Sequence, residues 1–297
     1  MSSSNSSPNS TPNSSPGAKL REAMAGGMVL APFVYDGFTA LIAEGQGAQA
    51  VYMTGHGTSA QIGLPDVGLT SMAEMVSNLG YIADAVDVPV IADADTGYGN
   101  AINAQRAVRE YETAGAAALH LEDQVFPKRC GFFEGKQCVP MAEHVQKIRA
   151  AIDARSDPDL VIIARTDAVA PNGWEDAIRR AEAYREAGAD VVFVDGVKTA
   201  EDMDIYTRRL VEQGLPCLYN GNLLPGPEIA ERGFKIMITG GGHALSYAAV
   251  RQALLALKQE GGGGEGRDLE RFNVMTGLLG LPEIYELEQR YTTKSGD

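Results

Sequence analysis

VPVIADADTG, residues 88–97, begins as an apolar run and then carries two aspartates near its end. The repetition of such runs along the chain indicates which fold the protein adopts. Seven more follow the same plan: VLAPFVYD (29–36), QAVYMTG (49–55), ALHLEDQ (118–124), LVIIARTDA (160–168), DVVFVDG (190–196), PCLYNGN (216–222) and KIMITGG (235–241). Several are apolar almost throughout, which is typical of strands that a parallel sheet buries on both faces. We therefore expect eight parallel strands.

Segments with helical spacing separate these runs. Residues 101–115, 142–157, 173–190 and 200–214 repeat apolar side chains at helical intervals, as amphipathic helices do. Eight βα units in 297 residues predict an α/β fold, a (β/α)₈ TIM barrel. An open, doubly wound sheet is the alternative.

The two ends of the chain differ in composition from the segment between them. Residues 1–17 are rich in Ser, Asn and Pro, which bury too little surface to order a chain, so we expect a disordered tail without a secretory signal. The barrel should occupy residues 18–260. Residues 261–297 contain a Gly-rich bridge (261–266) and a helical arm (268–291), which would pack on a neighbouring subunit or back on its own barrel.

Composition narrows the possible partners. A net charge of −14 argues against nucleic acid or an anionic membrane as the main partner. An anionic substrate must therefore be attracted by local features such as a metal ion, Lys or Arg. Three cysteines give no disulfide framework and indicate a reducing compartment, so we expect a cytoplasmic protein. No apolar run reaches the roughly 18 residues of a membrane span.

Polar side chains end almost every predicted strand. In a barrel these ends meet at one mouth, where the chemistry of such folds lies, although any one of the residues could simply cap the next helix. Asp93 and Asp95 are two residues apart, so they face the same side of a regular strand. Together with Glu122 they could surround one Mg²⁺ ion, which binds carboxylate oxygens and keeps positions for water and substrate.

The loop after the fourth strand, FPKRCGFFEGKQCVP (126–140), is long and contains glycine, so it is a candidate lid. Lys128 and Arg129 precede Cys130, and adjacent cations would lower the pKa of this thiol. A cysteine in that state could exchange protons with a carbon acid. The alternative is a basic surface turn with an incidental cysteine.

Four segments carry a family resemblance: YMTGHGTSAQIGLPDVGLTS (52–71), ADADTGYGN (92–100), HLEDQVFPKRCG (120–131) and IIARTDA (162–168). They resemble the isocitrate lyase/phosphoenolpyruvate mutase superfamily, in particular its short-chain members. The resemblance implies a barrel whose last helix is swapped between subunits, usually in a homotetramer. It also implies a Mg²⁺ or Mn²⁺ ion held directly by Asp95, with Asp93 and Glu122 nearby.

The same resemblance implies the other site residues. Cys130 would be the acid/base and Arg165 would bind substrate oxygens. Lys128 matches a polar residue at the mouth, and we place it with them among the catalytic residues. Asp123 is expected to orient its neighbours instead of binding metal. The substrate-binding residues that we predict are Tyr52, Thr54, Gly55, His56, Asp66, Arg129, Asp195, Asn220 and His243.

Three positions depart from the lyase pattern: Phe132 stands where the lyases usually have His, Asp195 where they have Glu, and Ala244 near an expected arginine. Without that arginine a tricarboxylic substrate would leave a carboxylate unpaired, so a smaller 2-oxo or 2-hydroxy diacid fits better. Cys130 favours cleavage of a C–C bond in such an acid through a metal-stabilised enolate. A carbon–phosphorus mutase or hydrolase acting on a phosphonopyruvate-type substrate, and a catalytically weakened relative, stay open as alternatives.

Overall fold

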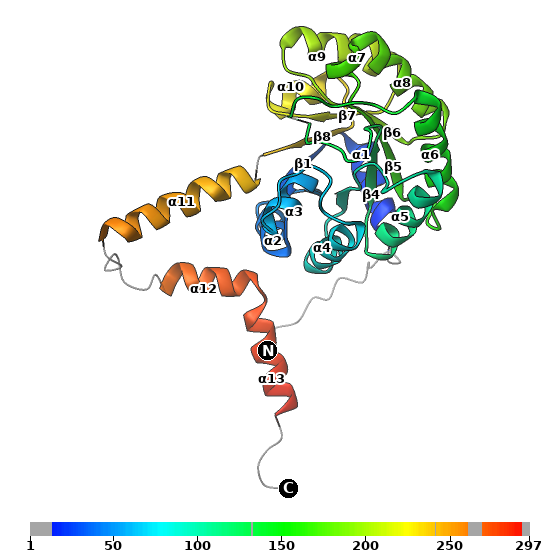
Figure 1. Cartoon of the computed structure of the whole chain (residues 1–297). Coiled ribbons are helices and arrows are strands. Elements are labelled where there is room, and N and C mark those ends of the chain that lie inside the picture. Colours follow the sequence, from blue (N-terminus) through cyan, green and yellow to red (C-terminus); the bar gives the residue numbers. More distant parts are fainter. Residues whose placement is uncertain (1–13, 132, 241, 261–268, 293–297) are drawn as a thin grey trace.

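The computed structural model describes residues 14–131, 133–240, 242–260 and 269–292. Its centre is a closed barrel of eight parallel strands in chain order, which confirms the predicted fold and excludes the open sheet (Figure 1). Each strand lies inside one of the eight predicted runs: β1 Val29–Val34, β2 Val51–Met53, β3 Val90–Asp93, β4 Ala118–Glu122, β5 Val161–Thr166, β6 Val191–Val194, β7 Cys217–Asn220 and β8 Ile236–Thr239.

Helices surround the barrel and alternate with its strands (Figure 1). Those between β1 and β8 are α2 Gly37–Gly45, α3 Gly55–Gln61, α4 Met72–Ala85, α5 Ala101–Thr113, α6 Met141–Ala154, α7 Val169–Asn172, α8 Trp174–Glu186, α9 Ala200–Tyr206 and α10 Gly226–Glu231. The predicted helix 200–214 continues from α9 into a π-helical segment, Thr207–Val211.

The barrel interior is filled with apolar side chains, so it forms a packed core below the mouth. Ile91, Ile163 and Phe193 are among the residues that are fully or almost fully buried there. A second layer, which includes Leu121 and Ile162, packs between the strands and the surrounding helices. The two layers use alternate residues of each strand because successive side chains point to opposite faces.

The N-terminal helix α1, Pro16–Gly26, begins within the predicted tail and includes its last two residues, 16 and 17. Ser15 caps it by accepting a hydrogen bond from the N–H of Ala18. Leu20 is fully buried in the barrel core, so burial of apolar surface holds this helix in place. Residues 1–13 of the predicted tail lie outside the described part of the chain.

After β8 the chain leaves the barrel. Helix α11, Gly242–Glu260, extends away from it, and α12, Leu269–Leu278, and α13, Leu281–Tyr291, follow (Figure 1). The predicted helical arm is therefore two helices, whereas the predicted Gly-rich bridge lies outside the described residues. Within the described residues, no helix combines the length and apolar character needed to cross a membrane.

Candidate active site

Strand register brings the predicted metal-binding carboxylates together at the mouth of the barrel. Asp93, the last residue of β3, pairs with His120 on β4, and Glu122 on β4 pairs with Arg165 on β5. The backbone N–H of Glu122 also donates to the carbonyl of Asp95 at 2.8 Å. The four predicted site residues Asp93, Asp95, Glu122 and Arg165 therefore lie on neighbouring strand ends.

Asp93 is held by several donors. The N–H of Gly55 donates to its Oδ2 at 3.1 Å, and the N–H of Asp95 donates to its Oδ1 at 3.0 Å. Burial disfavours the ionised form of this carboxylate, yet the neighbouring His120 side chain, the cations Lys128 and Arg165 and the N–H of Asp95 together lower the pKa of Asp93 to about 2. Asp93 is therefore ionised and fixed in orientation.

Asp95 adopts an uncommon backbone conformation, with φ of +47°. Aspartate tolerates this left-handed region better than most residues, and such strain is found at functional sites. Burial raises the pKa of Asp95 to about 6, although the ammonium of Lys128 opposes this effect. Lys128 Nζ lies 2.8 Å from Oδ1 of Asp95 and 2.5 Å from Oδ1 of Asp66, so the loop after β4 reaches into the carboxylate cluster.

The donor set fits a hard divalent cation. Asp93, Asp95 and Glu122 are buried and offer carboxylate oxygens, the ligands that Mg²⁺ prefers. Oε1 of Glu122 is buried without a hydrogen-bond partner among the described residues, while its Oε2 lies 3.3 Å from Nε of Arg165. Burial raises the pKa of Glu122 well above its ordinary value. A nearby cation would therefore favour its ionised form.

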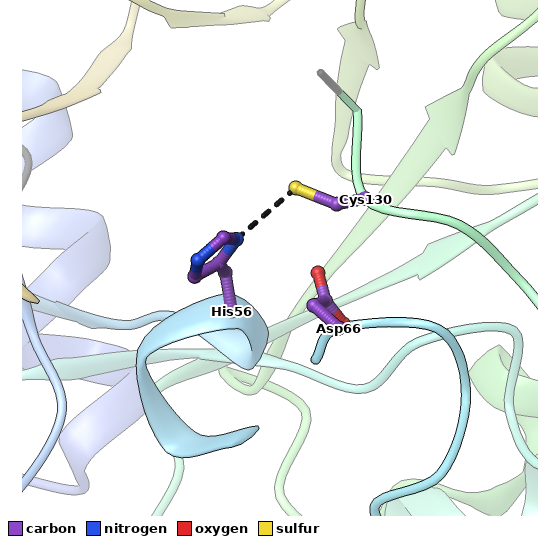
Figure 2. A group of neighbouring side chains, drawn as sticks. All are labelled: His56, Asp66 and Cys130. Atoms are coloured by element: carbon purple, nitrogen blue, oxygen red, sulfur yellow. Dashed lines mark hydrogen bonds between the residues drawn. The ribbon is translucent and has the colours of Figure 1, made fainter. Parts of the chain in front are cut away.

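Cys130 lies in the same region and is 7% exposed. Its Sγ is 3.3 Å from Nδ1 of His56, the second residue of α3, and Figure 2 shows the imidazole edge directed at the sulfur. The backbone N–H of Cys130 donates to the carbonyl of Asp66 at 3.1 Å. The potential ligand atoms of His56, Asp66 and Cys130 all lie within 4.8 Å of one another. The sulfur, the imidazole and this carboxylate therefore form one cluster.

A small cavity of about 90 Å³ lies beside these groups, although Asp95 and Glu122 are not among the residues that line it. Its lining includes most of the predicted site residues: Tyr52, Thr54, His56, Asp66, Asp93, Lys128, Cys130, Arg165, Asp195, Asn220 and His243. Phe33 and Gly131 complete the lining. The closed barrel thus gathers residues from all eight of its strands, or the segments that follow them, around a space suited to a small molecule.

Two of the residues predicted to contact the substrate, Arg129 and Gly55, do not line the cavity. Arg129 is exposed, and its guanidinium donates to the carbonyl of Glu134 at 3.0 Å, so it does not reach the cavity. The backbone N–H of Gly55 is already bonded to Asp93, so this residue positions a carboxylate. Ala244 is exposed on α11, and Phe132 lies outside the described residues.

The structure does not support the prediction that Lys128 and Arg129 lower the pKa of the Cys130 thiol. The charge of Lys128 is shared between Asp66 and Asp95, and Arg129 points away from the cavity. The imidazole of His56 is the nearest basic group to Cys130 for which the structure gives a distance. The two adjacent cations on which the sequence prediction relied are therefore engaged elsewhere.

Sequence reasoning missed Lys136. Its Nζ lies 2.9 Å from both Oδ1 of Asp167 and Oδ2 of Asp195, and all three side chains are buried. Burial lowers the pKa of a lysine, but the two carboxylates outweigh it and raise the pKa of Lys136, which stays charged. The signal available in the sequence was only that Lys136 lies in the long loop after β4.

Asp167 and His120 also have structural roles at the site that were not predicted from the sequence. Asp167 accepts two hydrogen bonds from Arg165, at 2.9 and 3.0 Å, which fixes the guanidinium. His120 Nε2 lies 2.8 Å from the hydroxyl of Tyr52 and 3.5 Å from Oδ1 of Asp93. Burial lowers the pKa of His120 to about 4, so it is neutral at neutral pH and supports the site from within the barrel.

Asp123 has the orienting position that was expected. It is fully buried and accepts hydrogen bonds from Thr166 Oγ1 (2.7 Å), Arg180 Nη1 (3.0 Å) and the Tyr184 hydroxyl (2.8 Å). It also accepts from the N–H of Asp167 at 3.0 Å. Asp123 thus ties β4 to β5 and α8.

Comparisons with known proteins agree with this geometry. The family model described as phosphoenolpyruvate phosphomutase matches residues 20–258. The chain is 41% identical over 283 residues to 2,3-dimethylmalate lyase of Eubacterium barkeri, covering 93% of this chain and 98% of that protein. The structure of oxaloacetate acetylhydrolase in complex with 3,3-difluorooxalacetate superposes with a TM-score of 0.86, at 35% identity and with 95% and 98% coverage. That of phosphonopyruvate hydrolase with oxalate and Mg²⁺ gives 0.85 at 30% identity, with 94% and 99% coverage.

Proposed function

The chain belongs to the phosphoenolpyruvate phosphomutase family, in the superfamily that also contains the isocitrate lyases, and from this premise we propose that it is a Mg²⁺-dependent carbon–carbon lyase. Its substrate would be a small 2-hydroxy or 2-oxo carboxylic acid. The superfamily acts on small carboxylic acids, and a relative that this chain matches over almost its whole length is named a lyase.

The observation that carries the proposal is the position of Cys130 at the cavity that Asp93 also lines. Cleavage of a C–C bond leaves an electron pair on one carbon, and that carbon needs a proton donor beside it. Cys130 is the thiol at this cavity, while Cys138 and Cys217 are not among its lining residues. A thiol donor and buried carboxylates around one small space support lyase chemistry.

Asp95 would hold the metal, with Asp93 and Glu122 beside it, because these are buried oxygen donors and Oε1 of Glu122 lacks a hydrogen-bond partner in the described chain. When bound, Mg²⁺ would supply stabilisation of negative charge on the substrate oxygens. Arg165, locked by Asp167, would orient a substrate carboxylate, and Lys128 would add a second positive charge.

The charges around the cavity limit the substrate. Among the described residues its permanent cations are Lys128 and Arg165, and both are already paired with carboxylates. A tricarboxylate would bring more negative charge than these groups can balance. With a cavity of about 90 Å³, this supports a small diacid in preference to methylisocitrate.

Phosphonopyruvate-type chemistry is the second candidate. The structural similarity to phosphonopyruvate hydrolase, with a TM-score of 0.85, favours it. Both reactions would use a metal to hold the oxygens of a small 2-oxo or 2-hydroxy acid, so the carboxylate cluster would serve either one.

A substrate panel separates these functions. The purified protein with Mg²⁺ would be given oxaloacetate, 2,3-dimethylmalate, methylisocitrate and phosphonopyruvate, and the release of organic acids and phosphate would be followed. Cleavage of oxaloacetate or dimethylmalate is expected. Release of phosphate or conversion of phosphonopyruvate would favour the second candidate, and no turnover of any compound would contradict both.

We also propose that the chain assembles as a homotetramer in which α11 packs on a partner barrel. Apolar side chains along α11, including Leu245, Tyr247 and Leu254, are largely exposed in the single chain. An apolar hollow of about 690 Å³ lies between α3 and α11. Contiguous exposed apolar surface of this kind is typical of subunit interfaces.

A cytoplasmic location is part of the same proposal. The three cysteines, Cys130, Cys138 and Cys217, form no disulfide with one another, as expected in a reducing compartment.

A further inference from the structure

His56 and Cys130 come from distant parts of the chain, yet they form a pair inside the cavity. His56 follows β2 on α3, and Cys130 lies in the long loop after β4. Nδ1 of His56 is 3.3 Å from Sγ of Cys130, within hydrogen-bond distance for sulfur (Figure 2). An imidazole at this distance can stabilise a thiolate and can return a proton to it.

The pair is fixed from both sides. The ring of His243 stacks on that of His56, with centroids 4.3 Å apart and planes 24° from parallel. The N–H of Cys130 donates to the carbonyl of Asp66, which anchors the sulfur-bearing residue. Stacking fixes the plane of His56, so its Nδ1 stays directed at the sulfur.

We infer that His56 is the proton-exchange partner of Cys130 and that His243 is a positioning residue for His56. This inference rests on the proposed lyase reaction for its purpose, but the pair itself is a property of the free protein. It gives His56 a role beyond the substrate binding predicted from sequence.

The proton balance of the step is simple. The S–H bond of Cys130 breaks, a C–H bond forms on the carbon released by cleavage, and the sulfur keeps the electron pair as a thiolate. The protonated imidazole of His56 then gives its Nδ1 proton to Sγ and becomes neutral. For a 2-hydroxy acid, solvent restores the imidazole proton and receives the proton lost from the substrate hydroxyl. For a 2-oxo acid such as oxaloacetate, a solvent water molecule first adds to the carbonyl and supplies that hydroxyl, so water is the only other reactant.

Other charged groups face this pair and would influence its titration. The cavity lining also holds Asp66, Asp93, Lys128, Arg165, Asp195 and His243. Burial and the neighbouring His56 lower the pKa of His243, so the second imidazole is neutral when the first is charged.

Thiol alkylation tests the pair without any substrate. The full-length protein and its His56→Gln variant would be treated with iodoacetamide from pH 5.5 to 9.5, and the rate at Cys130 followed by peptide mass spectrometry. We expect the variant to react at least fivefold more slowly at pH 6.5, with its profile moved up by about one pH unit towards an ordinary thiol pKa of about 8.5. A change smaller than fivefold would overturn the inference.

Cys138 in the same molecules is the internal control. It lies outside the cavity lining, and burial raises the pKa of its thiol, so it should react slowly and equally in both proteins. Faster labelling of Cys138 would report unfolding, and His56→Asn would then replace the first variant under the same criterion.

The result is independent of the lyase assay. A shifted alkylation profile with no turnover of any acid would support the pair and contradict the proposed function. Turnover of an acid with an unshifted alkylation profile would support the proposed function and contradict the pair. If His56 only bound substrate, its replacement would raise KM and leave the alkylation profile unchanged.

Discussion

Nζ of Lys136 lies 2.9 Å from Oδ2 of Asp195, and this buried ion pair ties the long loop after β4 to the end of β6. The same ammonium reaches Asp167 at the end of β5. Gly131 makes the approach possible, because a Cβ at this position would lie 2.7 Å from Oδ2 of Asp195. The loop that carries Cys130 is therefore fastened over the cavity by charge pairing.

Replacing this lysine should loosen the loop and destabilise the fold. Lys136→Met leaves Asp167 and Asp195 with one fewer buried partner, and breaking a buried pair in this way costs about 3 kcal/mol. Urea denaturation followed by circular dichroism measures the free energy of unfolding. The matched control is Lys198→Met at an exposed lysine, which should change it by less than about 0.5 kcal/mol. Equal stabilities of the two variants would contradict this account.

Asp95 should be needed for divalent-metal binding. Asp95→Asn removes the negative charge at the proposed direct ligand, so we expect Mn²⁺ affinity to fall at least about tenfold. Electron paramagnetic resonance of free Mn²⁺ in a titration gives the dissociation constant. Asp84→Asn, at an exposed aspartate on α4, is the control and should bind like the unmodified protein. Undiminished affinity of Asp95→Asn would move the metal site elsewhere.

Acid should destabilise the protein partly through His144. This side chain is fully buried against Tyr184, and burial lowers the pKa of His144 to about 4 from an ordinary value near 6.5. Between pH 6.5 and 4 the unfolded chain binds the proton and the folded chain does not. The stability present above pH 6.5 is therefore lost as pH falls, by up to about 3 kcal/mol.

His144→Leu should remove that contribution, so its unfolding free energy should fall less steeply between pH 6.5 and 4. Urea denaturation at a series of pH values measures the slope. His120, whose pKa is also about 4, remains in the variant, so part of the slope should persist. Parallel curves for the two proteins would show that His144 is not responsible.

Helix α11 should be required for assembly. Leu254 is 58% exposed on α11 and lines the hollow beside α3, so Leu254→Glu would place a charge in the proposed interface. We expect the molar mass from light scattering to fall from that of a tetramer to a smaller species. Ile102→Glu, at a 71% exposed residue of α5, is the matched control and should leave the mass unchanged. An unchanged mass for Leu254→Glu would contradict the swapped arrangement.

Much of the fold could be predicted from local sequence. Each strand could be predicted from a short apolar run, because both faces of a strand in this barrel are buried. This pattern can be read without knowledge of the rest of the chain. The position of the carboxylates at the mouth of the barrel could also be predicted, since parallel strands all end at the same mouth. In the structure, the strand register pairs Asp93 with a residue of β4 and Glu122 with a residue of β5. The sequence by itself therefore determined the barrel and the acidic cluster at its mouth.

Only the tertiary structure decided which charges and side chains meet in the loops. Lys136 and Asp195, or His56 and Cys130, are separated by 59 and 74 residues, and no local periodicity links them. Arg129 and Lys128 are adjacent in sequence, yet one faces solvent and the other enters the cavity. The physical reason is that a buried charge must find a partner, and barrel closure determines which partners are within reach.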